Sequence, residues 1–284
     1  MTDHRPARVA ALVAQLEAAQ LDAILLTGLA NIRYLTGFAG TSALVIVTRR
    51  AEVVLITDFR YQTQAAEQVG AAARIVIEQA SLWAGLWQQL PLLAYTQVVG
   101  FESAHLVHRD FQRLLETGSR WSWRPTTDLV ESLRERKDTD EVALIRAAGE
   151  VAMRALARTL DAIRPGMTEL AVAGLLEGNL RIEGSEGFPF ETIVASGPRA
   201  ALPHARASER VLARGDLLLI DFGAIVEGYC ADVTRTVVLG PADERQQEVH
   251  GVVQAANERA AAAVRVGMSG RQADAIAREF LTLQ

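Results

Sequence analysis

The sequence lacks a long apolar run, an excess of basic residues and more than one cysteine. No stretch approaches the length of a membrane span, and the first 20 residues lack the apolar core of a secretory signal, so we expect a cytoplasmic protein without a membrane partner. The net charge of −5 argues against nucleic acid as a partner, because neutralising phosphates requires clustered Lys and Arg. Cys230, the single cysteine, cannot form an internal disulfide and is expected to be a buried structural thiol.

The 284 residues suffice for two domains, and a 50% apolar composition indicates a globular chain. The first domain is expected over residues 1–130, where strand-like and helix-like patterns alternate as in α/β proteins. Strands are predicted at 23–27, 43–48, 53–57, 74–78 and 98–101, and helices at 9–19, 59–69, 82–90 and 109–117.

The second domain, residues 131–284, contains an internal repeat. Residues 163–168, Ile-Arg-Pro-Gly-Met-Thr, are echoed by residues 264–269, Val-Arg-Val-Gly-Met-Ser. Each copy follows an Ala-rich helix and precedes a second helix that begins at a Thr or Ser N-cap. Strands follow the first copy, whereas the sequence reaches its last residue before a second set of strands. We therefore expect the second repeat to be incomplete.

Residues 217–236 are predicted to form two strands folded back at Glu227 and Gly228. A two-residue turn predicts three facing pairs: Val226 with Tyr229, Gly223 with Asp232, and Asp221 with Thr234. Because opposed residues share a face, Asp221 and Asp232 would be diagonal neighbours, close enough to bind one or two cations. A change of one residue in the turn would place them on opposite faces.

Two interpretations of this carboxylate pair remain open. Carboxylates that face each other in an apolar hairpin repel and are costly to bury unless a cation or proton joins them, which favours a metal site. Alternatively, both are solvated charges at exposed strand edges. Thr234 could orient Asp221 by a hydrogen bond, although an ordinary strand threonine fits the pattern equally well.

Three motifs together resemble the pita-bread metallopeptidases, and in particular the Xaa-Pro branch with prolidase and aminopeptidase P. The hairpin from Asp221-Phe-Gly to Asp232-Val-Thr-Arg-Thr is similar to the first metal-ligand segment of that family. Residues 191–204, Glu-Thr-Ile-Val-Ala-Ser-Gly-Pro-Arg-Ala-Ala-Leu-Pro-His, resemble the Xaa-Pro branch. Residues 31–38 and 56–61 resemble its accessory domain. The resemblance implies an α/β N-terminal domain like that of creatinase and prolidase, followed by an α+β pita-bread domain that is incomplete here.

The resemblance also implies a function, a metal-dependent peptidase that hydrolyses Xaa-Pro bonds in proline-containing peptides, as a dipeptidase or an aminopeptidase. It implies two divalent ions (Mn, Co or Zn) with Asp221 and Asp232 as ligands, His204 as a residue that contacts the peptide, and a homodimer. Thr234 would support Asp221 from outside the ligand shell. In the family, a His and two Glu ligands lie in the half that this sequence does not reach. We therefore expect no stoichiometric metal in this chain at micromolar concentration, and no activity in this truncated form.

Two alternatives from other functional classes remain. One is a non-catalytic module that uses the pita-bread scaffold to bind peptides or a protein partner, which the missing ligands favour and which the retained Asp221, Asp232 and His204 oppose. The other is a creatinase-like hydrolase that works without metal, which the intact aspartate pair opposes. One departure from the family concerns the loop around His204, because Ala205 and Arg206 follow it where relatives have Gly and a small residue.

Overall fold

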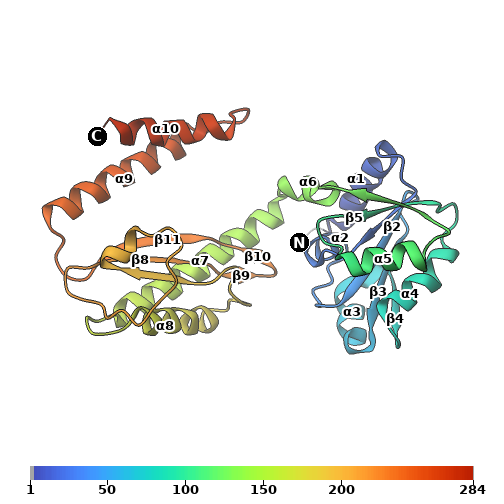
Figure 1. Cartoon of the computed structure of the whole chain (residues 1–284), viewed down its shortest axis with the longest axis horizontal. Helices are drawn as coiled ribbons and strands as arrows, with labels where there is room; N and C mark the ends of the chain where they lie inside the picture. Colours follow the sequence, from blue (N-terminus) through green and yellow to red (C-terminus); the bar gives the residue numbers. More distant parts are fainter. Residues whose placement is uncertain (1–2, 284) are drawn as a thin grey trace. The chain divides into compact units, whose positions relative to one another are not determined.

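A computed structural model describes residues 3–283, which fold into two compact units that divide between Val142 and Ala143 (Figure 1). The division falls within α7 (Thr139–Ala162), whereas the sequence predicted a boundary between residues 130 and 131. Within residues 3–283, no helix combines the length and the apolar content that a membrane crossing requires.

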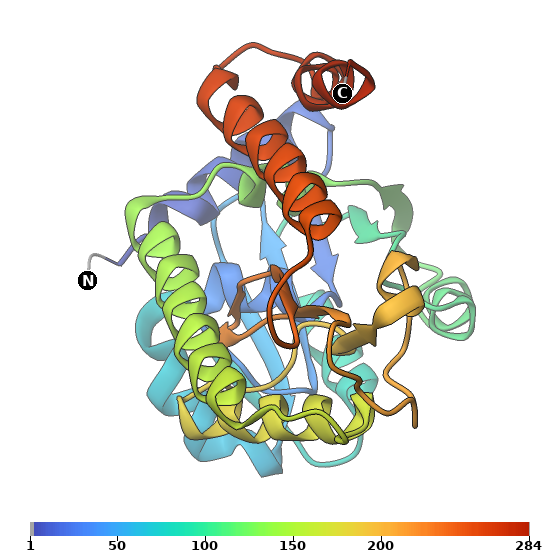
Figure 2. The ribbon, with the colours of Figure 1, turned by 90° about the vertical axis from the view of Figure 1, so that its left-hand side faces the viewer.

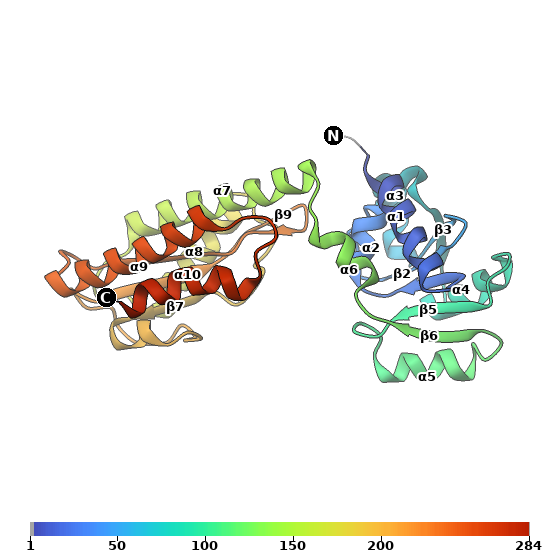
Figure 3. The same ribbon diagram turned by 90° about the horizontal axis from the view of Figure 1, so that it is seen from above.

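The first unit is built on a mixed sheet in the order β4-β3-β2-β1-β5-β6, in which β5 and β6 lie side by side (Figure 3). The strands predicted from the sequence are present with small shifts of their ends. Their bounds are β1 (Ala23–Leu26), β2 (Ala43–Thr48), β3 (Val53–Asp58), β4 (Arg74–Glu78), β5 (Val98–Glu102) and β6 (Ser122–Thr126). Strands β2 and β3 form an antiparallel hairpin.

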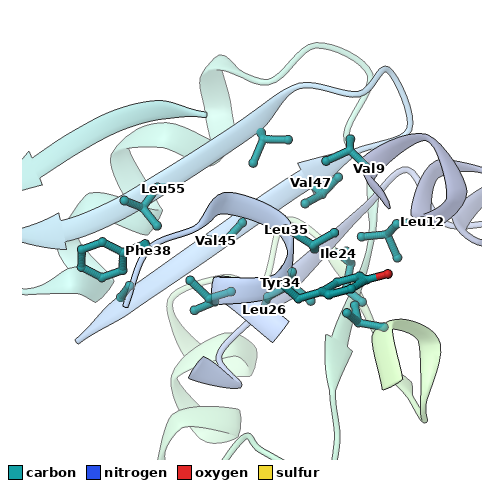
Figure 4. Close-up of a cluster of buried hydrophobic side chains, with 14 of the residues drawn as sticks. Val9, Leu12, Ile24, Leu26, Tyr34, Leu35, Phe38, Val45, Val47 and Leu55 are labelled. Atoms are coloured by element: carbon teal, nitrogen blue, oxygen red, sulfur yellow. The ribbon is translucent and has the colours of Figure 1, made fainter. Parts of the chain in front are cut away.

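Helices cover both faces of this sheet. Ile24 and Val45 pack in one apolar cluster with α1 and α2, while Leu25 and Leu44 pack in another cluster with α4 and α5. Figure 4 shows the first of these clusters. Burial on both faces explains why the strands read as continuous apolar runs rather than as alternating ones. The helices are α1 (Arg5–Ala18), α2 (Leu29–Thr36), α3 (Gln62–Val69), α4 (Leu82–Gln89), α5 (His108–Glu116) and α6 (Leu129–Glu135), with short 3-10 turns η1 (Phe59–Tyr61), η2 (Gly70–Ala72) and η3 (Leu90–Leu92).

The second unit places α7 and α8 on one side of a sheet with the order β11-β8-β7 (Figures 1 and 2). Leu218, Ile220 and Phe222 of β8 are fully buried against these helices. Asn179 of α8 donates a buried hydrogen bond to Thr159 of α7 (2.9 Å), which fixes how the two helices pack. The elements are α8 (Glu169–Ile182), β7 (Ile193–Ser196), η4 (Gly197–Ala201), β8 (Leu217–Phe222), β9 (Ile225–Val226), β10 (Tyr229–Cys230), β11 (Val233–Val238), α9 (Glu244–Ala263) and α10 (Gly270–Thr282).

The internal repeat has the same local geometry in both copies. Arg164 and Arg265 each donate their backbone N–H to the sulfur of the methionine three residues later, at 3.4 and 3.3 Å. Each guanidinium also closes the end of the preceding helix by donating to two carbonyl groups there. Gly166 and Gly267 adopt similar positive φ angles of 97° and 92°. The repeat predicted from the sequence is therefore a repeat of structure, at least through its two helix pairs.

Candidate metal centre

The residues of strand β8, which contains Asp221, alternate between the buried and the more accessible face of the sheet. Leu218, Ile220 and Phe222 face the helices, so Asp221 lies on the opposite face of the sheet and is half-buried. The charged side chain thus avoids the apolar core that its neighbours build.

The turn between β9 and β10 sets the register of the whole hairpin. Glu227 and Gly228 both have positive φ angles, 45° and 74°, as a two-residue turn of the primed type requires. Two strand pairs give the register on either side of Asp232: Tyr229 lies opposite Val226, and Thr234 lies opposite Asp221. The predicted register is confirmed, and it places Asp232 opposite Gly223 and diagonal to Asp221.

Thr234 donates its hydroxyl hydrogen to Asp221 Oδ1 at 2.9 Å. Asp232 is exposed, two residues before Thr234 on the same chain segment. The hairpin therefore presents one carboxylate held in a fixed orientation and a second, solvent-accessible carboxylate nearby. Carboxylate oxygens are ligands that Mn²⁺ and Mg²⁺ prefer and that Co²⁺ and Zn²⁺ accept, so this donor set fits a divalent cation.

Gly223 has a steric reason to be glycine. A Cβ atom at this position would lie 2.1 Å from the carbonyl oxygen of Ala231 and 2.4 Å from Cγ of Pro189. That region is held together by the hydrogen bond from the Ala231 N–H to the Ala224 carbonyl (2.9 Å). The glycine in the Asp-Phe-Gly motif thus permits a close backbone approach beside the two aspartates.

His204 lies in the loop that follows η4 and is exposed. Strand β7, which precedes this loop, pairs with β8 so that Ile193 lies opposite Asp221. No hydrogen bond or ion pair within residues 3–283 joins His204 to Asp221 or Asp232. The structure thus brings Asp221 and Thr234 into contact and places Asp232 on their hairpin, while His204 belongs to a neighbouring loop.

The comparisons with known families cover nearly the whole chain. Residues 8–136 match the creatinase/prolidase N-terminal domain, and residues 143–284, half of the chain, match metallopeptidase family M24. The chain belongs to metallopeptidase family M24. This M24 chain has a creatinase-like N-terminal domain followed by a pita-bread domain, as the three sequence motifs predicted.

Relatives and solved structures agree with this assignment. The uncharacterized peptidase YqhT of Bacillus subtilis is 34% identical over 261 residues, which cover 92% of this M24 chain and 73% of that protein. The structure of an Xaa-Pro dipeptidase from Bacillus anthracis matches with a TM-score of 0.92 at 34% identity, covering 98% of this chain and 78% of that one. An X-Pro aminopeptidase from Thermotoga maritima matches with a TM-score of 0.86 at 34% identity, covering 97% of this chain and 77% of that one.

A different cluster of metal-ligating side chains lies in the first unit of this M24 chain. Glu102, His105 and Glu131 bring ligand atoms within 4.8 Å of one another. However, Asn31 Nδ2 lies between the two carboxylates and donates to an oxygen of each at 2.6 Å. Arg134 donates to Asn31 Oδ1 at 2.7 Å, which fixes the orientation of this amide. We therefore interpret the cluster as a hydrogen-bond network rather than as a cation site.

His105 also belongs to this network, because its Nε2 lies 3.1 Å from Glu131 Oε1. Burial raises the pKa of Glu131, but the hydrogen bonds from Asn31 and His105 outweigh burial and leave the pKa below its ordinary value. Asn31 is far along the chain from Glu102 and Glu131, so the sequence did not predict the network. Its only link to the sequence analysis is the motif at residues 31–38, which begins at Asn31.

The prediction for Cys230 was wrong. Its side chain is exposed rather than buried. Cys230 pairs with Ile225 in the short β9–β10 ribbon next to the turn. A residue so close to a tight turn has few elements available to cover it, which the apolar pattern of the strand did not reveal.

Proposed function

We propose that this protein is a metal-dependent peptidase that hydrolyses the peptide bond before proline, with Asp221 and Asp232 as metal ligands. The observation that carries the proposal is the hairpin register, which puts both aspartates on one face and bonds Asp221 to Thr234. The names of the two solved structures, a dipeptidase and an aminopeptidase, support Xaa-Pro substrates without choosing between these two activities.

The residues of the chain would divide the work as follows. A divalent cation (Mn²⁺, Co²⁺ or Zn²⁺, two in the complete site) supplies an activated water and polarises the scissile carbonyl. Thr234 would hold Asp221 in one orientation through Oδ1, which leaves Oδ2 as the oxygen that could bind the cation. The exposed imidazole of His204 donates a hydrogen bond to the peptide. The amide before proline has no N–H, so recognition must rely on its carbonyl and on shape.

A substrate panel tests this function. The purified chain is incubated with Ala-Pro, Ala-Pro-Ala and Ala-Ala at millimolar Mn²⁺, Co²⁺ or Zn²⁺, and the products are separated by chromatography. Metal-dependent cleavage of the proline substrates only would support the proposal, and it would overturn the expectation from the sequence that residues 1–284 alone are inactive. Preference for the dipeptide would identify a dipeptidase, and preference for the tripeptide an aminopeptidase. Equal cleavage of Ala-Ala, or cleavage that survives chelation of the metal, would contradict the proposal.

One observation favours a non-catalytic peptide-binding module as the second candidate. Within residues 3–283, no group of three metal-ligating side chains includes Asp221 or Asp232. Such a module would bind the proline peptides in the same panel without cleaving them at any metal concentration. Calorimetry on the uncleaved peptides separates this outcome from the absence of any recognition.

Where activity is measurable, replacing Thr234 with Val is expected to raise the Mn²⁺ concentration needed for half-maximal activity by about 10-fold, because the side chain that orients a metal ligand is lost. Thr234→Ser keeps the hydroxyl and is the matched control. We expect this control to behave like the wild type. The role assigned to Thr234 would be wrong if both variants required the same Mn²⁺ concentration as the wild type.

We also propose a cytoplasmic homodimer. The exposed thiol of Cys230 suits a reducing compartment, and a disulfide at Cys230 in protein isolated from its source cells would contradict that location. The dimer rests on the family resemblance, and sedimentation of the purified chain at the mass of a monomer would contradict it.

A further inference from the structure

Glu169 is a buried carboxylate at the start of α8, in the second unit. Its side chain has no solvent exposure, although it stands at the first helical position, directly after the N-cap Thr168. A negative charge there interacts favourably with the helix dipole, but this does not require burial. A fully buried carboxylate is costly unless several donors satisfy it, so its partners should show why it is there.

The partners of Glu169 come from both ends of one loop. Ser196, the last residue of β7, donates its backbone N–H and its hydroxyl to Oε1 at 2.7 and 2.8 Å. Ser208 donates its backbone N–H and its hydroxyl to Oε2 at 3.1 and 2.7 Å. The segment 197–207 between these serines contains His204. One side chain therefore ties the beginning and the end of the His204 loop together.

A third attachment reaches into the loop itself. Arg199 donates from Nε to Glu169 Oε2 at 3.1 Å, and its Nη2 donates to the carbonyl oxygen of Arg206. Ala205, the residue after His204, is buried. The backbone directly after His204 is thus held by the inward packing of Ala205 and by the bridge from Arg199, which lies earlier in the same loop, while His204 itself is exposed.

The hydrogen bonds from Ser196, Ser208 and Arg199 require Glu169 to be ionised. Burial raises the pKa of its carboxyl, but the hydrogen bonds from Ser208 and Ser196 and the positive charge of Arg199 outweigh burial, so the pKa lies below its ordinary value. Only an ionised carboxylate offers acceptor oxygens on both sides at once. In Glu169→Gln, one carboxylate oxygen is replaced by an amide NH₂, which is a donor. The NH₂ would then face the backbone N–H of Ser196 or Ser208, which is also a donor and cannot accept a hydrogen bond.

We propose that Glu169 is a positioning residue that holds the His204 loop, residues 197–207, in the conformation that presents His204 to a substrate peptide. The presentation of a substrate rests on the proposed function, whereas the clamping of the loop does not. Without the clamp, the loop opens while the helices and the sheet behind it remain folded.

Hydrogen–deuterium exchange of the full chain tests the clamp without any assay of activity. In Glu169→Gln, we expect amides in 197–207 to exchange about 10- to 100-fold faster, the factor expected when charge-assisted hydrogen bonds of a local structure are lost. Amides of α7 and β8 should exchange as in the wild type. Glu209→Gln removes the same charge from an exposed residue next to Ser208 and should leave the loop unchanged.

Three results would overturn the proposal. The amides of residues 197–207 could exchange at the wild-type rate in Glu169→Gln, or they could exchange equally fast in Glu209→Gln. The third result is that the amides of α7 and β8 exchange faster by the same factor as those of the loop. If Glu169→Gln does not fold, Ser208→Ala decides instead, because it removes one donor and keeps the charge. We expect faster exchange in its loop alone, and no change there would overturn the clamp.

A double-mutant cycle separates positioning from general stability once cleavage of Xaa-Pro substrates is measurable. The losses in kcat/KM from Glu169→Gln and His204→Ala should not add, because both remove the same contact with the peptide. Additive losses would show that Glu169 does not act through His204. If the wild type cleaves no proline substrate, the proposed function fails, and the exchange experiment still decides whether Glu169 clamps the loop.

Discussion

Gly223→Ala is expected to destabilise the second unit by about 3 kcal/mol. The new Cβ would lie 2.1 Å from the carbonyl oxygen of Ala231 and 2.4 Å from Pro189 Cγ, and neither belongs to a flexible side-chain end that could move away. Relief requires the hairpin to shift beside Asp221 and Asp232, so the metal site should be disturbed together with stability. Urea denaturation followed by far-UV circular dichroism measures the loss.

The chain provides two controls for this experiment. All four tryptophans, at positions 83, 87, 121 and 123, lie in the first unit, so the unfolding transition followed by their fluorescence should not change. Gly178→Ala, in the exposed part of α8, adds a Cβ that meets nothing within 4 Å and should stabilise the same unit by about 0.5–1 kcal/mol. Wild-type stability of Gly223→Ala would show that the backbone approach at Gly223 is not as close as described.

Where metal-dependent cleavage of Xaa-Pro substrates is measurable, Asp221→Asn is expected to lower it by at least about 100-fold, because loss of an outer-shell partner alone already costs about 10- to 100-fold. The amide keeps the shape of the side chain and can still accept from Thr234, so the fold should be preserved. The measurement is the initial rate at saturating Mn²⁺, with circular dichroism to confirm folding.

Glu227→Gln is the matched control for Asp221→Asn. It removes one negative charge from the same hairpin, at the turn, where Glu227 is exposed. We expect it to retain the rate of the wild type. Equal rates in all three proteins would exclude Asp221 as a metal ligand, and equal losses in both variants would indicate a general effect of charge.

The hairpin could be predicted from the sequence because its determinants are local. Glu227 and Gly228 adopt the positive φ angles of a primed turn, and the turn length then fixes every opposed pair back to Asp221 and Thr234. The strands of the first unit were predictable for a similar reason, since burial on both faces leaves uninterrupted apolar runs.

What escaped prediction depends on contacts between distant residues. Helix α2 is short and lies between Gly28 and Gly37. Asn31 in this helix donates hydrogen bonds to Glu102 and Glu131, which lie 71 and 100 residues further along the chain. Glu169 likewise looked like an ordinary acidic residue in the first turn of a helix. Its partners lie 27 to 39 residues further along the chain, and no local pattern reports that a loop returns to the helix at that point.

A Mn²⁺ titration followed by NMR line broadening tests most directly whether the cation binds at the Asp221–Asp232 hairpin. Two side-chain carboxylates bind weakly, so we expect no stoichiometric uptake at micromolar Mn²⁺. At higher concentration, amides of residues 221–234 should broaden first, and Asp232→Asn should remove this effect. Broadening that begins around Glu102, His105 and Glu131, or that is unchanged in Asp232→Asn, would contradict the assignment of the metal centre.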